Sequence, residues 1–171
     1  MSRIPVSLDP FQPRSLNQQW EGDYDRSDLP RVASVAPNDA PLAVHVSFGL
    51  ARGQLGEVRL QGWIAGALEL CCQRCLQPMT WRFRLQSDAV LLGPEGSPGA
   101  LGEDRDVVEI GADGLFRPAE FVEEEILLAL PLSPRHDDCD QERRREFEPG
   151  AVSHGSADSP FAVLGDLRKR S

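Results

Sequence analysis

The sequence predicts an α+β fold: a twisted antiparallel sheet, open or curled into a small partial barrel, with one packed amphipathic helix and a flexible tail that carries a short C-terminal helix. Apolar residues alternate with polar ones over residues 42–48, 58–70 and 79–86, as in strands with one buried face. Residues 118–130 instead repeat their apolar positions with a helical period. With 171 residues, the chain can close one hydrophobic core but not two full-sized ones.

The N-terminal stretch, residues 4–32, mixes apolar and polar residues without a sustained period. We expect it to lie as an extended strand and short turns on a core formed elsewhere. The alternating stretches that follow predict an antiparallel meander. Gly62 and Gly66 interrupt its second strand and suggest bulges or bends there.

Residues 93–105 are rich in glycine and proline and predict a loop, after which residues 107–110 form a short strand. The helix begins at Pro118, which suits a first helical turn, and ends before Pro131. Its glutamates lie near the N-terminus, where the helix dipole favours negative charge.

The predicted domain organisation is a single globular domain at 1–136, a flexible linker at 137–159 and a short docking helix at 160–171. The linker is polar and charged, so it has too little apolar surface to bury for the gain to offset the conformational entropy lost on ordering. The apolar residues of the terminal helix share one stripe: Phe161, Leu164 and Leu167. Such a stripe must be covered, either by a partner or by the domain itself.

The charge of the chain favours basic partners. Asp and Glu number 27 against 18 Lys and Arg, so the formal net charge is −9. This excess repels a phosphate backbone, so direct binding of naked RNA is disfavoured, whereas a basic protein is a suitable partner. No apolar run approaches the roughly 20 residues of a membrane span. We expect a cytoplasmic protein whose cysteines stay reduced and free to bind metal.

Two residue pairs could form a structural zinc site. Cys72 and Cys75 form a C-x-x-C motif in the turn between two predicted strands, and His136 and Cys139 follow the helix. Three cysteines and one histidine are a ligand set that tetrahedral zinc accepts. The alternative is that Cys72 and Cys75 are small buried hydrophobes and that the other two lie exposed in the linker.

The sequence lacks the common signatures of hydrolases, nucleotide-binding proteins and deaminases, so we expect no catalysis. The alternative is a zinc-dependent RNA-processing hydrolase built on the four possible metal ligands. Three consecutive carboxylates, Glu123, Glu124 and Glu125, fan around the predicted helix as a solvated acidic face. We predict that they help to steer a basic partner.

Several segments together resemble the bacterial YceD family, known as large ribosomal RNA subunit accumulation proteins. They span nearly the whole chain: residues 4–10, the C-Q-R-C-L-Q-P segment at 72–78, the V-E-E-E-I-L-L-A-L-P segment at 122–131, His136 with Cys139, and residues 159–164. The resemblance implies a role in the synthesis, processing or stability of the large-subunit (23S) ribosomal RNA, without known catalytic activity. It also implies a gene beside that of a small basic ribosomal protein.

The function hypothesis is therefore an assembly factor that supports ribosome biogenesis. It would bind a basic large-subunit ribosomal protein or a precursor ribosomal particle through acidic surfaces. The predicted partner-binding residues are the three glutamates and the three apolar residues of the terminal helix.

Overall fold

The computed structural model describes residues 3–37, 40–54, 56–94 and 106–139. The predicted terminal helix, and all of the predicted linker after Cys139, lie outside the described residues. Within them the structure is an α+β fold with a five-stranded sheet, as predicted. None of the helices in these ranges is long and apolar enough to cross a membrane.

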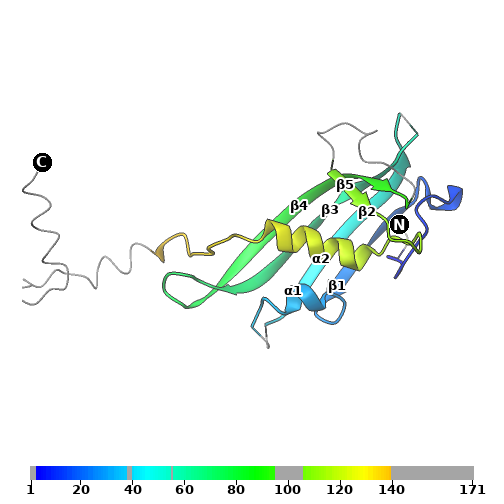
Figure 1. The fold of residues 1–171 in the computed structure, drawn as a ribbon. Helices are drawn as coiled ribbons and strands as arrows, with labels where there is room; N and C mark the ends of the chain where they lie inside the picture. The colour runs from blue at the N-terminus through cyan, green and yellow to red at the C-terminus, as the bar shows by residue number, and fades with distance from the viewer. Residues whose placement is uncertain (1–2, 38–39, 55, 95–105, 140–171) are drawn as a thin grey trace, which may run out of the picture. The chain divides into compact units, whose positions relative to one another are not determined.

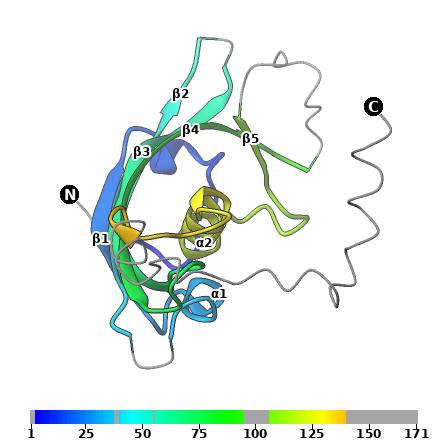
Figure 2. The ribbon, with the colours of Figure 1, turned by 90° about the vertical axis from the view of Figure 1, so that its left-hand side faces the viewer.

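The five strands lie in the sheet in the order in which they occur in the chain (Figure 1). They are β1 (Gln19–Asp25), β2 (Ala43–Arg52), β3 (Val58–Cys71), β4 (Pro78–Leu92) and β5 (Asp106–Glu109). The first four pair antiparallel, which confirms the meander predicted from the alternating pattern. The sheet curves without closing into a barrel (Figure 2).

The last pairing differs from the prediction, because β5 runs parallel to β4 and the sheet is therefore mixed. A parallel pair needs a connection that returns to the starting end of the sheet, usually about a dozen residues long. The stretch at 93–105 has that length. Nothing in its composition distinguishes such a crossover from a wide hairpin loop.

One helix of three turns, α2 (Pro118–Ala129), lies in the concave side of the curved sheet (Figure 2). It begins at the predicted proline and buries Val122 and Ile126 completely. These side chains belong to one cluster with apolar residues of β2, β3 and β4, including Val44, Leu68 and Phe83. The helix therefore covers the inner face of the sheet, as its period indicated.

The N-terminal segment contributes more to the core than its irregular pattern predicted. It contains a 3-10 turn, η1 (Pro13–Ser15), the edge strand β1 and a short helix, α1 (Pro30–Ala33). Leu29 and Val32 around α1 are fully buried. Trp20 of β1 joins a second apolar cluster at the other end of the sheet.

The two glycines of β3 do not mark bulges. The pairing register of β3 with β2 and β4 runs unbroken through both positions. A Cβ atom on Gly62 would lie 2.2 Å from the carbonyl oxygen of Ser47, and one on Gly66 would lie 2.9 Å from that of Ala43. Glycine is needed at these two positions because β2 passes too close for a side chain.

Candidate metal centre

The turn between β3 and β4 folds its C-x-x-C motif into a tight loop. The backbone N–H of Cys72 donates to the carbonyl of Gln77, and the N–H of Leu76 donates to the carbonyl of Cys72, both at 2.9 Å. Leu76 closes the loop in the left-handed region, with φ of 62°. This conformation is unusual for a branched side chain, so the surrounding contacts must hold the loop in this shape.

The segment that follows α2 is hydrogen-bonded to this turn. The backbone N–H of Gln73 donates to the carbonyl of Pro134 at 2.8 Å. Two residues later, His136 turns its Nδ1 toward the Sγ of Cys75, 3.4 Å away, and its Nε2 lies 3.0 Å from the carbonyl oxygen of Pro78. A hydrogen bond from Nε2–H to that carbonyl leaves the Nδ1 lone pair facing the cysteines.

The structure brings together all four residues that the sequence nominated as metal ligands. The possible ligand atoms of Cys72, Cys75, His136 and Cys139 lie within 4.8 Å of one another. Zinc bonds of about 2.3 Å to sulfur and about 2.0 Å to nitrogen, in tetrahedral geometry, place donors roughly 3.5–3.8 Å apart. The cluster therefore needs only a small contraction to hold a zinc ion.

Local electrostatics also favour a metal at this position. Cys72 is fully buried, yet the pKa of its thiol is lowered to about 5. The main cause is a hydrogen bond from the backbone of Cys75, with further backbone bonds from Arg74 and His136, and these together outweigh the opposing effect of burial. Zinc binds the thiolate form of cysteine, so this lowered pKa prepares a ligand at neutral pH.

The histidine completes the requirements of a zinc site. Metal-binding histidines usually donate their second ring N–H to a carbonyl or a carboxylate, which fixes the ring and its tautomer. The bond from His136 to the carbonyl of Pro78 has this form. The residues present thus fit a structural zinc site of three cysteines and one histidine. Cys71 is exposed and is not among the four.

The three glutamates of α2 have different environments, unlike the uniformly solvated face that we expected. Glu123 is only 4 % exposed and accepts hydrogen bonds from the backbone of α1. Glu124 is exposed and lies 3.6 Å from Arg31. Glu125 accepts a hydrogen bond from the hydroxyl of Ser87 at 2.9 Å. The other predicted partner-binding residues, Phe161, Leu164 and Leu167, lie outside the described residues.

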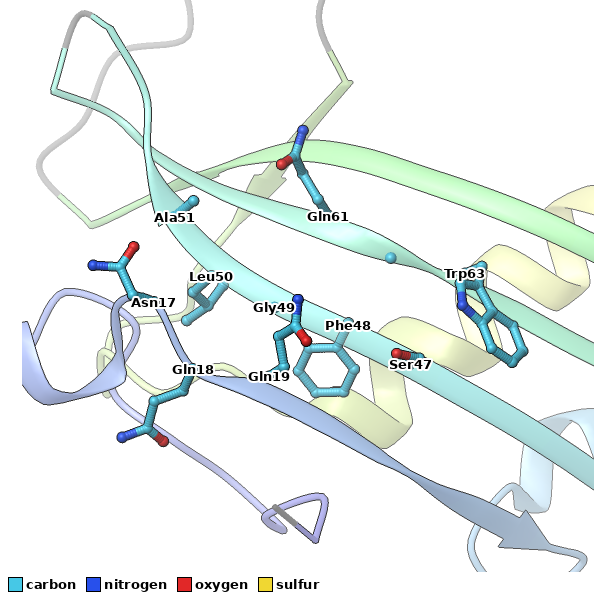
Figure 3. Close-up of a pocket in the computed structure, with 11 residues that line it drawn as sticks. Asn17, Gln18, Gln19, Ser47, Phe48, Gly49, Leu50, Ala51, Gln61 and Trp63 are labelled. Carbon is cyan, nitrogen blue, oxygen red and sulfur yellow. The ribbon is translucent and has the colours of Figure 1, made fainter. Parts of the chain in front are cut away.

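The structure also contains an uncharged groove that the sequence analysis missed (Figure 3). It has a volume of about 970 Å³ and lies over the small residues of β2 and β3, including Gly49 and Gly62. Gln19, Gln61 and Trp63 are among the residues that line it. Apart from two residues just before β1, the lining residues come from β1, β2 and β3, so only the pairing of these three strands brings them together.

The chain is similar to known proteins over most of its length. A family profile described as large ribosomal RNA subunit accumulation protein YceD matches residues 60–168, a range that contains the four possible metal ligands. A protein of Haemophilus influenzae named large ribosomal RNA subunit accumulation protein YceD is 26% identical over 172 residues, which cover 98% of each chain. No solved structure matches the chain.

Proposed function

Because the chain belongs to the YceD family of large ribosomal RNA subunit accumulation proteins, we propose that it supports the synthesis, processing or stability of 23S ribosomal RNA by holding a basic ribosomal protein or a precursor ribosomal particle. The observation that carries this proposal is the family match across residues 60–168, which include α2 and the metal centre. The name of the Haemophilus influenzae relative supports the same role. We propose that this role is performed in the cytoplasm.

The proposed part played by the metal centre is structural. Zinc at Cys72, Cys75, His136 and Cys139 would have four protein ligands, and a site of this kind leaves no position for a water molecule or a substrate. The role of the metal centre would be to link the β3–β4 turn to the segment after α2. The backbone bond between Gln73 and Pro134 lies across the same junction.

This ligand set also argues against the alternative, a zinc-dependent RNA hydrolase. Catalytic zinc normally keeps an open coordination position at which it activates water. We therefore propose that the protein acts by binding. Hydrolysis of large-subunit precursor RNA by the purified zinc-loaded chain, lost in a Cys75→Ser variant, would favour the hydrolase instead.

The proposed binding surface is acidic. Glu124 is exposed on α2 and can face a basic partner directly, whereas Glu123 is buried and acts by positioning α1. Phe161, Leu164 and Leu167 remain proposed contacts of a C-terminal docking helix. A segment of about ten residues is too short to be a stable helix alone, so its apolar stripe requires a covering surface.

The experiment that tests this function begins with a strain that lacks the gene. The full chain should restore the ratio of 23S to 16S ribosomal RNA, and it should co-purify with a basic large-subunit protein or a precursor particle in mild salt. A chain that ends at Asp158 should restore less RNA at unchanged thermal stability if the tail docks on a partner. Failure of the full chain to restore the ratio would contradict the proposed function.

A further inference from the structure

A second groove lies between the N-terminal half of α2, the start of α1 and the segment from β5 to Arg117. Its volume is about 760 Å³, and we call it the acidic groove. We propose that the acidic groove receives a lysine- or arginine-rich segment of a protein partner, anchored by an apolar side chain. This inference rests on the proposed function and names the surface that carries it.

The charges that line the acidic groove are predominantly negative. Its acidic residues are Asp28, Glu109, Glu120, Glu123 and Glu124, against two arginines. Both arginines already have carboxylate partners: Arg31 lies 3.6 Å from Glu124, and Arg117 pairs with Asp113 and lies 3.8 Å from Glu120. A positively charged segment would therefore meet an excess of carboxylates.

All of these carboxylates except the buried Glu123 remain accessible to a partner. The side chains of Glu120 and Glu124 are 69% and 62% exposed, and Glu109 at the end of the edge strand β5 is exposed as well. Pairs at such exposed positions contribute little to folding. The exposed carboxylates can instead raise the association rate of an oppositely charged partner, and this effect falls as the salt concentration rises.

Apolar residues give the acidic groove an anchoring site beside its charges. Val6 is 92 % exposed, and Val108, Leu115 and Phe121 are partly exposed in the lining. A single exposed valine is common on protein surfaces and needs no explanation. Val6, however, lies with three other apolar residues in a concave surface, and such a patch is typical of an interaction site. A partner side chain buried against them would gain roughly 25 cal/mol per Å² of apolar surface.

The exposed carboxylates and the apolar patch together favour a basic protein segment over other ligands. A nucleic-acid backbone would be repelled by the carboxylates of the lining, and a neutral or acidic peptide would gain no attraction from their net negative charge. The groove of Figure 3 offers no comparable selection, because its lining carries no charged side chain.

The first test is photo-crosslinking in living cells. The full chain carries a benzophenone amino acid in place of Val6, and the control chain carries it in place of Thr80, which is exposed on β4. We expect the Val6 position to crosslink to a protein segment of net positive charge, mapped by mass spectrometry, and the Thr80 position not to yield that segment. The absence of a crosslink at Val6, or a crosslink to RNA or to a neutral or acidic segment, would overturn the inference.

The second test reverses charge in matched pairs. Glu109→Lys with Glu120→Lys changes the acidic groove, and Glu69→Lys with Asp106→Lys changes two residues of β3 and β5 that do not line it. Both pairs alter the net charge of the chain equally. We expect the groove pair to lower the Val6 crosslink by roughly fivefold or more and the control pair to leave it nearly unchanged. Equal yields in the two pairs would overturn the inference.

The two proposals fail in different ways. If the wild-type chain restores 23S ribosomal RNA in the deletion strain but the groove pair restores it equally well, the acidic groove is not the binding surface and the proposed function stands. If the wild-type chain itself restores nothing, the proposed function fails. Thermal melting of each variant separates a loss of binding from a loss of fold.

Discussion

The buried carboxylate of Glu123 in α2 accepts a hydrogen bond from the backbone N–H of Val32 in α1, at 3.3 Å, and a second from the N–H of Arg31. The first N–H groups of a helix have no partner within it, and α1 receives no side-chain cap from its own N-cap residue, Leu29. One glutamate thus supplies the cap for a helix that is far away in the chain.

Replacement of this carboxylate should destabilise the fold. Glu123→Ala leaves buried N–H groups without an acceptor, and we expect a loss of about 1–3 kcal/mol in the free energy of unfolding. Glu124→Ala, at the neighbouring exposed position, should change it by less than about 0.5 kcal/mol. Urea denaturation of the two variants checks this, and similar midpoints for both would show that the cap contributes nothing.

Zinc content should follow the four predicted ligands. Protein purified without a metal-affinity tag should contain about one zinc ion per chain by elemental analysis, because the donors fit a closed tetrahedral site. Cys72→Ser and His136→Ala should each reduce the zinc content and the melting temperature. Cys71→Ser is the matched control and should keep both. A wild-type zinc content near zero would refute the metal centre.

The sequence predicted those strands and helices whose pattern of apolar residues can be seen within one continuous stretch. The alternation in β2, β3 and β4 and the helical period of α2 could be recognised because each has one buried face. The direction of β5 and the cap on α1 could not, because both depend on partners distant in sequence.

The metal centre and the acidic groove also differ in how far the sequence predicted them. The metal ligands were found because cysteine and histidine pairs are rare and carry specific chemistry, so residue type alone nominated them. The acidic groove was predicted only in part. Two of its carboxylates, Glu123 and Glu124, were expected to steer a basic partner, but the rest of its lining comes from the N-terminal segment, α1 and the region around β5. No single stretch of the sequence contains its charge pattern.

Gly62 should not tolerate a side chain. Its Cβ atom would lie 2.2 Å from the carbonyl oxygen of Ser47 and 2.7 Å from the Cα of Phe48, and both atoms belong to the backbone of β2. Gly62→Ala must therefore push two paired strands apart, at an expected cost of about 3 kcal/mol.

A control for this substitution is available in the loop after β5. Gly111→Ala meets only the side chain of Asp113 at 3.6 Å, an ordinary contact, so its stability should change by less than about 0.5 kcal/mol. Denaturant unfolding of both variants measures the difference. A Gly62→Ala protein as stable as Gly111→Ala would show that β2 and β3 can separate without cost.

Stability should depend on pH through His45, which lies on β2 between two carboxylates of β1. Its Nδ1 is 2.7 Å from Asp23 and its Nε2 is 3.0 Å from Glu21. The hydrogen bond with Asp23, followed by that with Glu21, raises the pKa of His45 above its usual value. Both ring nitrogens can donate at once only when the imidazole is protonated, so folding favours the charged form.

A pKa raised by folding gives stability that is present below the unfolded value, about 6.5, and is lost as the pH rises through the folded value. The stability difference between the wild type and His45→Gln should thus be larger near pH 6 than near pH 8.5. NMR titration of the His45 ring should give a pKa above 6.5, which Asp23→Asn lowers. If Asp23→Asn leaves the pKa of His45 unchanged, the hydrogen bond between His45 and Asp23 does not stabilise the protonated imidazole.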